Sequence, residues 1–287
     1  MRVAIVQVCS DDDLAGNLAR AERGVAEAAE CGAKFVALPE NFAYMRREGG
    51  KFPCAQGPDG EIVAALRGWA SRYGVWLLGG TFPEAIEGDE RVYNTSIVCS
   101  PEGLEIARYR KMHLFDVALG DNTHKTHKTE NTDDTENTSG VYRESTHFAP
   151  GNELVLAKTP FGGLGLSVCY DLRFPEFYRA LTLQGARWLA VPSAFTRETG
   201  KDHWEVLLRA RAIENQAYVI APAQCGHHSA DRSSHGRSMI IDPWGLVLAQ
   251  GGDAPTVLVA DCPTAEIDRV RKAIPALKHR RLPNQAD

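Results

Sequence analysis

The 287-residue sequence lacks long apolar segments and an excess of basic residues. No apolar stretch approaches the roughly 20 residues that a transmembrane helix needs, and the run at residues 3–6 is too short for the core of a signal peptide. There are 32 Lys and Arg residues against 37 Asp and Glu, a net charge of −5, so no basic domain is available for nucleic acid. We therefore expect a cytoplasmic protein that binds neither membranes nor nucleic acid.

The sequence also lacks paired cysteine motifs. Its seven cysteines are scattered along the chain, are odd in number and include no CxxC pair. This pattern argues against a disulfide framework and against a zinc site made of cysteines. Most of the cysteines are therefore expected to be small buried hydrophobic residues in a reduced protein.

Residues 121–140 contain no apolar side chain at all. Threonine recurs at every third position from Thr123 to Thr138, and such a segment cannot bury enough apolar surface to offset the entropy lost on ordering. We predict an exposed or disordered low-complexity insertion here. His124 and His127 have an HxxH spacing, but without flanking acidic residues on an ordered helix this spacing does not indicate a metal site.

Strand and helix patterns alternate through the rest of the chain. Short apolar runs are typical of buried strands, and apolar residues recurring at helical spacing are typical of helices. The main predicted strands are residues 3–8, 35–38, 75–79, 92–98, 104–109, 164–168, 188–191, 218–221, 238–241 and 257–259, and the predicted helices are residues 14–28, 61–72, 175–184 and 202–216. The alternation favours one layered α/β domain over residues 1–287, and the number of strands suggests two packed sheets with helices outside.

Three residues with reactive or charged side chains stand where predicted strands end. Glu40 follows a buried strand, where α/β proteins hold ligands and where partial burial suits a general base. Lys111 closes a β segment, and in a closed pocket a lysine can stabilise an oxyanion or a thiolate. Cys169 lies between an apolar strand and a helix start, the layout of a nucleophile in a sharp turn. Each has a structural alternative, namely a capping or loop glutamate, a solvated edge lysine and a buried cysteine.

Motifs around these residues resemble the signature blocks of the nitrilase superfamily of carbon–nitrogen hydrolases. The blocks are Leu38-Pro39-Glu40, Tyr109-Arg110-Lys111-Met112-His113-Leu114 and Val168-Cys169-Tyr170-Asp171-Leu172-Arg173-Phe174-Pro175-Glu176. They occur in the family's order of Glu, Lys and Cys, and the resemblance continues through residues 192–195, 203–216 and 241–245. It covers essentially the whole chain except the threonine-rich segment.

The resemblance implies a Glu-Lys-Cys catalytic triad at Glu40, Lys111 and Cys169, with no metal and no organic cofactor. Residues 142–145 resemble the block that supplies a second active-site glutamate, so Glu144 is expected as an auxiliary acid. The backbone N–H of Tyr170 is expected to join Lys111 in stabilising the oxyanion. The family fold is a four-layer α-β-β-α sandwich, usually assembled as a homodimer or a larger homo-oligomer.

The residues at the nucleophile resemble the amidase branch of the family. Nitrile-cleaving members tend to have Cys-Trp-Glu, whereas this chain has Cys169-Tyr170-Asp171. The blocks are most similar to those of deaminated-glutathione amidases, metabolite-repair enzymes that hydrolyse a small-molecule amide. An ω-amidase acting on α-ketoglutaramate or another small amide is the alternative.

The substrate that this resemblance implies, an amide of α-ketoglutarate, is dicarboxylate-like. We therefore expect cationic side chains near the pocket. Arg173, four residues beyond the nucleophile, is the candidate to hold a carboxylate by a bidentate pair, unless it forms a salt bridge with Glu176 or Asp171. Phe195 and Thr199 follow a predicted strand and are expected near the pocket mouth, or else as ordinary loop residues.

Other functions stay open at the level of sequence. A nitrilase or N-carbamoyl amino acid hydrolase would share the same triad, and a non-enzymatic scaffold would be expected to have lost part of it. A thiol peptidase would need a histidine paired with Cys169, for which His203 and His235 are the only plausible residues.

Overall fold

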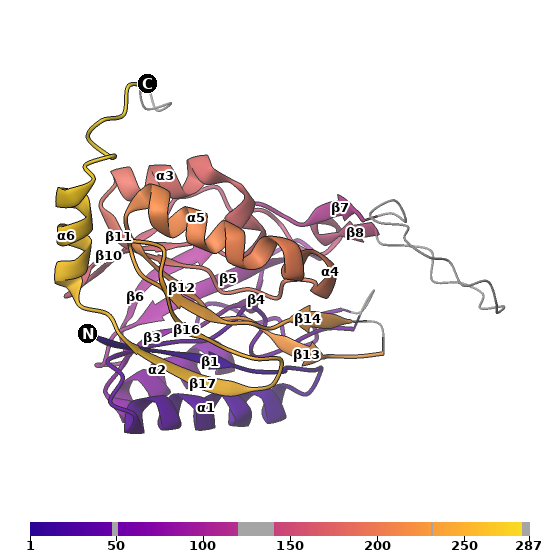
Figure 1. The fold of residues 1–287 in the computed structure, drawn as a ribbon. Coiled ribbons are helices and arrows are strands. Elements are labelled where there is room, and N and C mark those ends of the chain that lie inside the picture. Colours follow the sequence, from indigo (N-terminus) through magenta and orange to yellow (C-terminus); the bar gives the residue numbers. More distant parts are fainter. Residues whose placement is uncertain (48–50, 120–140, 231, 283–287) are drawn as a thin grey trace, which may run out of the picture.

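Two β-sheets lie face to face in the computed structural model, and helices cover the outer face of each (Figure 1). The structure describes residues 1–47, 51–119, 141–230 and 232–282. The expected four-layer α-β-β-α arrangement is confirmed. The predicted insertion at residues 121–140, with His124 and His127, lies outside the described residues.

The first sheet combines strands from the N-terminal part of the chain with one late strand. Its order is β17-β1-β2-β3-β5-β4, with β6 also paired to β5, and β1, β2 and β3 run parallel. The strands are β1 (Arg2–Gln7), β2 (Phe35–Ala37), β3 (Trp76–Leu78), β4 (Phe82–Ala85), β5 (Val92–Cys99), β6 (Glu105–Arg110) and β17 (Thr256–Asp261). The helices on its outer face are α1 (Leu14–Glu30) and α2 (Glu61–Tyr73).

The second sheet is built from the later part of the chain. Its order is β16-β15-β12-β11-β10-β9, and β10, β11 and β12 run parallel. The strands are β9 (Leu156–Thr159), β10 (Gly162–Leu166), β11 (Ala186–Ala190), β12 (Tyr218–Ala221), β15 (Met239–Ile241) and β16 (Val247–Gln250). The helices on its outer face are α3 (Pro175–Leu183) and α5 (Glu205–Asn215), and α6 (Thr264–Ala273) lies near the C-terminus.

Strand β1 explains why several strands of this protein are continuous apolar segments in the sequence. Val3 and Ile5 belong to the core cluster that includes the second sheet, whereas Ala4 and Val6 pack with residues of α1. Both faces are therefore buried, as in other sheets covered on both sides. Gly24 lets α1 approach this strand closely, because a Cβ atom there would lie 2.2 Å from Cγ1 of Val6.

The helix predicted at residues 202–216 differs from the structure at its start. The segment opens with a π turn, η3 (Gly200–Trp204), and the α-helix α5 begins only at Glu205. Gly200, at the start of this turn, lies against the ring of His235, where a Cβ atom would approach Cγ to 2.3 Å. Close packing at this point accompanies the wider turn.

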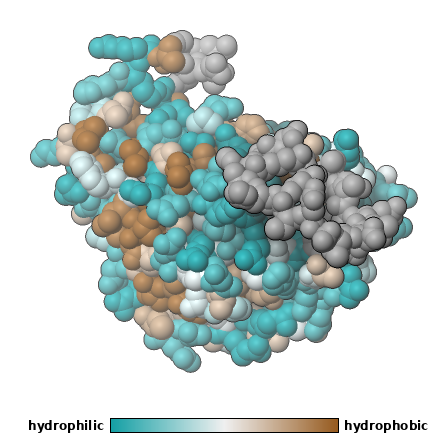
Figure 2. Space-filling view, turned by 45° about the vertical axis from the view of Figure 1, so that its right-hand side comes forward, coloured by the Kyte–Doolittle hydropathy of each residue, from teal (hydrophilic) through white to brown (hydrophobic). Residues whose placement is uncertain are grey.

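Two small ribbons and a short helix gather at one end of the sandwich (Figure 1). They are the ribbon of β7 (Asp116–Ala118) and β8 (Val141–Arg143), the ribbon of β13 (Cys225–His227) and β14 (Ser233–His235), and the helix α4 (Arg197–Thr199). With this end turned forward, the surface is mostly hydrophilic and its apolar residues form separate patches (Figure 2). None of the helices in the described residues combines the length and the hydropathy that crossing a bilayer requires.

Candidate active site

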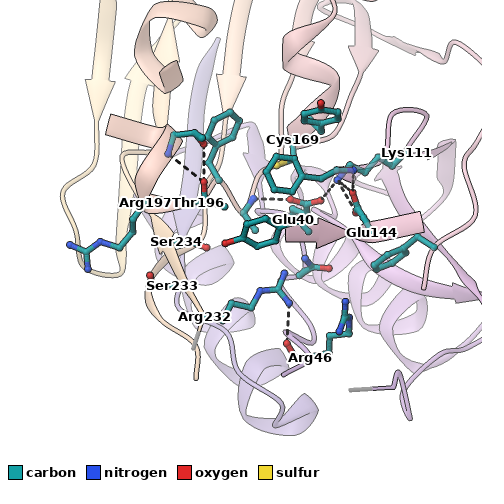
Figure 3. A pocket seen from close by; sticks show the side chains of 18 of the residues that line it. Glu40, Arg46, Lys111, Glu144, Cys169, Thr196, Arg197, Arg232, Ser233 and Ser234 are labelled. Carbon is teal, nitrogen blue, oxygen red and sulfur yellow. Dashed lines mark hydrogen bonds and ion pairs between the residues drawn. The ribbon is translucent and has the colours of Figure 1, made fainter. Parts of the chain in front are cut away.

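A cavity of about 310 Å³ lies at the end of the sandwich where the ribbons and α4 meet. Its walls come from segments far apart in the sequence, including β8, α4, β14 and the loop that follows β2. Glu40, Lys111, Glu144 and Cys169 all line it (Figure 3). Glu40 follows β2 and Cys169 follows β10, so residues beyond the ends of two parallel-paired strands, one from each sheet, meet in this cavity.

Glu40 stands three residues beyond β2 and is only 3% exposed. Its Oε1 accepts hydrogen bonds from Nδ2 of Asn94 at 2.8 Å and from Nζ of Lys111 at 3.1 Å. Its Oε2 accepts a hydrogen bond from the backbone N–H of Ala194 at 2.8 Å. Three donors from three segments therefore fix the orientation of this buried carboxylate.

Lys111 follows β6 and is 2% exposed. Its Nζ lies 2.9 Å from both carboxylate oxygens of Glu144, in addition to its contact with Glu40. Burial alone would lower the pKa of Lys111, but the charges of Glu144 and Glu40 outweigh it and raise that pKa well above its usual value. The lysine is therefore a buried cation held between two carboxylates.

Glu144 begins the short 3-10 helix η1 (Glu144–Thr146), directly after β8. Besides its two contacts with Lys111, its Oε2 accepts a hydrogen bond from the backbone N–H of Phe115 at 2.6 Å. The expected auxiliary acid thus lies next to the lysine, and Phe115 links it to the start of the β7–β8 ribbon.

Cys169 is the first residue of the 3-10 helix η2 (Cys169–Arg173) and has the left-handed φ of +48°. Its N–H donates to the carbonyl of Pro192 at 2.9 Å, which ties the turn to the segment after β11. The residue is 8% exposed and lines the cavity. Burial and the neighbouring Glu40 carboxylate raise the pKa of the Cys169 thiol well above 9, against the opposing charge of Lys111. The resting side chain is therefore a neutral thiol beside a carboxylate.

Asp171 is a fully buried residue that sequence reasoning did not assign to the site. Its Oδ2 accepts hydrogen bonds from Tyr109 Oη at 2.7 Å and from the N–H of Val168 at 2.8 Å. Its Oδ1 accepts one from the N–H of His113 at 3.0 Å and lies 2.7 Å from Nδ1 of the same residue. Tyr109 and His113 flank Lys111 in the sequence, so Asp171 connects the cysteine turn to the lysine segment.

The other residues expected around the nucleophile lie at different places. Tyr170, Phe195 and Thr199 line the cavity. The N–H of Tyr170 is in the first turn of η2 and donates to none of the described residues, as is usual for the first N–H groups of a helix. It is thus available to a bound group.

Arg173 is not among the residues that line the cavity. Its guanidinium carbon lies 5.4 Å from the ring centre of Phe195, and its Nη1 lies 3.3 Å from Nδ1 of His203. The alternative salt bridge to Asp171 or Glu176 does not form in the part of the chain that the structure describes. Arg173 therefore lies behind the cavity wall.

The histidines that a thiol peptidase would need are also absent from the cavity lining. His203 lies in η3 beside Arg173, and the N–H of His235 in β14 donates to the carbonyl of Phe195 at 2.8 Å. Glu40, by contrast, lines the cavity together with Cys169. This arrangement favours a carboxylate base over an imidazole base.

Sequence reasoning missed several residues of the site. Asn94 is the first of three consecutive buried polar residues in β5, Asn94-Thr95-Ser96, and this polar run inside a buried strand is the signal that could have identified it. The missed cations that line the cavity are Arg46, Arg143, Arg197 and Arg232. They stand in loops, a short ribbon and the short helix α4, where no local pattern distinguishes a cavity residue from a surface residue.

A family model and curated relatives both match this chain over nearly its whole length. Residues 2–272 match the family model described as carbon-nitrogen hydrolase. The deaminated glutathione amidase of Synechocystis sp. strain PCC 6803 is 44% identical over 280 residues, which cover 96% of this chain and 97% of the relative. That of Yersinia enterocolitica is 38% identical over 282 residues, which cover 98% of this chain and 93% of the relative.

Solved structures with the same fold come from three further proteins. Saccharomyces cerevisiae Nit3, a member of branch 10 of the nitrilase superfamily, gives a TM-score of 0.84 at 30% identity and covers 98% of this chain and 97% of its own. The C. elegans NitFhit protein gives a TM-score of 0.84 at 35% identity, and this chain spans 65% of its length and matches over 98% of its own. The amidase of Nesterenkonia sp. AN1 gives a TM-score of 0.74 at 28% identity, over 97% of this chain and 99% of that one.

Proposed function

Since the chain belongs to the carbon–nitrogen hydrolase family and is an amidase, we propose that its substrate is deaminated glutathione. In this compound an amide bond joins α-ketoglutarate to cysteinylglycine. Relatives of up to 44% identity that are named deaminated glutathione amidase support this choice. The second candidate is an ω-amidase activity on α-ketoglutaramate, because the two substrates share the same acyl group.

One observation carries the proposal: a buried thiol, a buried carboxylate and a buried ammonium group line a single cavity. Cys169, Glu40 and Lys111 are each less than a tenth exposed. Burial of three reactive groups is costly for folding unless they are paired, so their concentration at one place points to catalysis. A thiol, a proton acceptor and a cation are the groups that nucleophilic hydrolysis of an amide needs.

The first step is attack of Sγ of Cys169 on the amide carbonyl carbon. A carboxylate oxygen of Glu40 accepts the thiol proton as the carbon–sulfur bond forms. The raised pKa of Cys169 keeps the thiol protonated until substrate arrives, so proton transfer accompanies the attack. The carbonyl oxygen becomes an oxyanion, which the ammonium group of Lys111 and the N–H of Tyr170 stabilise.

The second step breaks the carbon–nitrogen bond. Glu40 returns the proton to the nitrogen of the departing cysteinylglycine, and the acyl group stays on Cys169 as a thioester. The same carboxylate then takes a proton from a water molecule, whose oxygen attacks the thioester carbonyl. The carbon–sulfur bond breaks, α-ketoglutarate leaves, and the thiolate recovers the proton from Glu40. The mechanism assigns no step to a metal or an organic cofactor.

Glu144 acts in this mechanism through Lys111. Both of its oxygens contact Nζ at 2.9 Å, so it fixes the position of the ammonium group and helps to keep it charged. Lys111 can therefore stabilise an oxyanion without giving up its own proton.

The proposal is tested by comparing four substrates with the purified protein. Release of α-ketoglutarate from deaminated glutathione is expected to be faster than turnover of α-ketoglutaramate, a nitrile or an N-carbamoyl amino acid. The Cys169→Ala variant is the control for background hydrolysis, and a thioester adduct trapped on Cys169 would be seen by mass spectrometry. A strong preference for the nitrile or the carbamoyl compound would contradict the proposed substrate.

We extend the proposal to assembly, domain organisation and location. Ile213, Trp244 and Leu246 are exposed large apolar residues on α5 and the adjoining β15–β16 turn, which supports a homodimer or a larger homo-oligomer. The family match over residues 2–272 supports one catalytic domain. All seven cysteines are free thiols, which supports a reducing cytoplasm and a role in metabolite repair there.

A further inference from the structure

The charges that line the cavity are unevenly matched. Among the described residues that line it, five cationic side chains face three carboxylates, those of Glu40, Glu144 and Glu198. Lys111 is already bound by Glu40 and Glu144, so this inner cluster has an excess of negative charge and would repel a carboxylate of the substrate. Any carboxylate of the substrate must therefore be bound elsewhere in the cavity. The remaining cations are Arg46, Arg143, Arg197 and Arg232.

Two of these arginines differ from the others in their surroundings. Arg143 and Arg197 are exposed, and Nη1 of Arg197 lies 3.5 Å from Nε2 of His227. Arg46 is only 8% exposed and is one of the residues that line the cavity. Its guanidinium carbon lies 5.6 Å from the ring centre of Phe52, which also lines the cavity. A planar cation supported by an aromatic ring is well suited to bind a carboxylate.

Arg232 lies beside Arg46 in the same wall. Its Nη1 donates a hydrogen bond to the backbone carbonyl of Arg46 at 3.0 Å. In Figure 3 both arginines lie on the far side of Glu40 from Cys169. Within the described ranges no carboxylate pairs with Arg232. Two neighbouring positive charges are more favourable when an anion lies between them.

Hydrogen bonds fix the two segments that carry these arginines. In the loop before Arg46, the carbonyl of Phe42 accepts a bond from Ser10 Oγ at 2.8 Å, and the N–H of Met45 donates to the carbonyl of Asp11 at 2.9 Å. A site that is already ordered loses little entropy when it binds its ligand.

Strand β14, which follows Arg232, is fixed through His228. Nδ1 of His228 lies 2.8 Å from the carbonyl of Ser10 and therefore donates to it, so Nε2 accepts a hydrogen bond from Oγ of Ser234, also at 2.8 Å. Ser234 lines the cavity. Ser10 thus contacts both segments, through Phe42 on one side and His228 on the other.

We propose that Arg46 and Arg232 form a carboxylate-binding site for the amide substrate. The site takes a carboxylate of the substrate and so selects acidic amides over neutral ones. It replaces Arg173 in the role expected from the sequence. This inference rests on the proposed function only in its choice of substrate, because the charge and position of the two arginines are independent of that choice.

The experiment uses Arg46→Gln and Arg232→Gln with three substrates that share one scissile bond. They are deaminated glutathione, its analogue with the glycine carboxylate converted to an amide, and its analogue with the α-keto carboxylate converted to a methyl ester. Each variant is expected to raise KM for deaminated glutathione about tenfold or more, with kcat changed much less. Arg72→Gln, an exposed arginine on α2, is the matched control for loss of one positive charge.

The two analogues identify which carboxylate is bound. If the arginine variants and the wild type have the same KM for the glycine amide, the site binds the carboxylate of the leaving group. If they have the same KM for the methyl ester instead, the site binds the carboxylate of the acyl group. Equal effects on all three substrates, or no effect on any, would overturn the proposal. Thermal unfolding and Arg46→Lys, which keeps the charge, separate loss of binding from loss of folding.

A second measurement does not depend on the substrate. Glutarate is expected to protect Cys169 from alkylation by iodoacetamide in the wild type, and Arg46→Gln and Arg232→Gln should lose this protection. If the wild type hydrolyses no α-ketoglutaramyl amide but the protection follows the arginines, the proposed substrate fails and the carboxylate site stands. If turnover is as proposed and the variants bind glutarate like the wild type, the site fails and the proposed function stands.

Discussion

The inner end of the cavity and its rim are built in different ways. At the inner end Glu40, Lys111 and Cys169 are buried, and several hydrogen bonds to other segments fix Glu40 and Lys111. At the rim Arg143 and Arg197 are exposed and belong to a short ribbon and a short helix. In a buried network each bond is strengthened by the low dielectric and each missing bond is costly. The inner end therefore has one stable geometry, whereas substitutions at the rim are expected to change the free energy of unfolding only slightly.

Replacing the proposed base is the strongest test of the inner end. Glu40→Gln keeps the size and most hydrogen bonds of the side chain but cannot accept the thiol proton. Turnover is expected to fall by about 10²–10⁴-fold, with much less effect on unfolding, as measured by steady-state kinetics and thermal melting. Glu205→Gln, an exposed glutamate on α5, is the control. Turnover close to that of the wild type would instead indicate a Cys–His peptidase mechanism.

Asp171 tests whether the support of the inner end matters as much as its reactive groups. In Asp171→Asn a neutral amide replaces a buried carboxylate that accepts bonds from Tyr109, Val168 and His113. We expect a loss of about 2–4 kcal/mol in the free energy of unfolding, together with a lower kcat and a nearly unchanged KM. Urea unfolding and steady-state kinetics measure the two effects.

The exposed Asp59→Asn on the loop before α2 provides a matched control, because its side chain is 79% exposed. A change in stability alone, with kcat unaltered, would show that Asp171 supports the fold without positioning the nucleophile. A change in neither would contradict the importance assigned to the buried network.

His228, which fixes the strand that follows Arg232, provides a test through pH of the support of the proposed carboxylate site. Burial, with smaller contributions from Arg232 and His227, lowers the pKa of His228 from 6.5 to about 4 despite its bond to Ser10. Between these values the unfolded chain binds a proton that the folded chain does not, so stability falls as the pH decreases from about 6.5 to about 4. The loss is at most about 3 kcal/mol. His228→Gln is expected to flatten this part of the profile of unfolding free energy against pH, and an unchanged slope would contradict the assignment.

The smallest effect is expected at Arg173. Because this side chain lies outside the cavity lining and packs against Phe195, Arg173→Gln should change KM for deaminated glutathione by less than about threefold, well below the effect expected at Arg46. Steady-state kinetics on the two variants side by side gives the comparison. An equal or larger rise in KM for Arg173→Gln would move the carboxylate site to the position that the sequence suggested.

The sequence predicted the inner end better than the two arginines of the proposed carboxylate site, for a physical reason. Glu40 follows an apolar strand that pairs in parallel with both of its neighbours, and such strands bring their carboxyl ends to one edge, so the position of this residue could be inferred locally. Arg46 and Arg232 are 186 residues apart and meet only because Ser10 and the β13–β14 ribbon bring their segments together. The direction in which Arg173 points depends on the turn at Cys169, which no spacing rule determines. Side-chain direction in irregular segments is set by tertiary contacts.

The left-handed backbone of Cys169 places two selective pressures in conflict at one position. A residue with a Cβ atom is strained by about 1–2 kcal/mol at the φ of +48°, and glycine would relieve that strain. Only a residue with a side chain can supply a nucleophile, however. Directed evolution for thermostability without a requirement for activity would therefore be free to replace this cysteine, so screens for more robust variants of this enzyme need to select for turnover as well as for survival on heating.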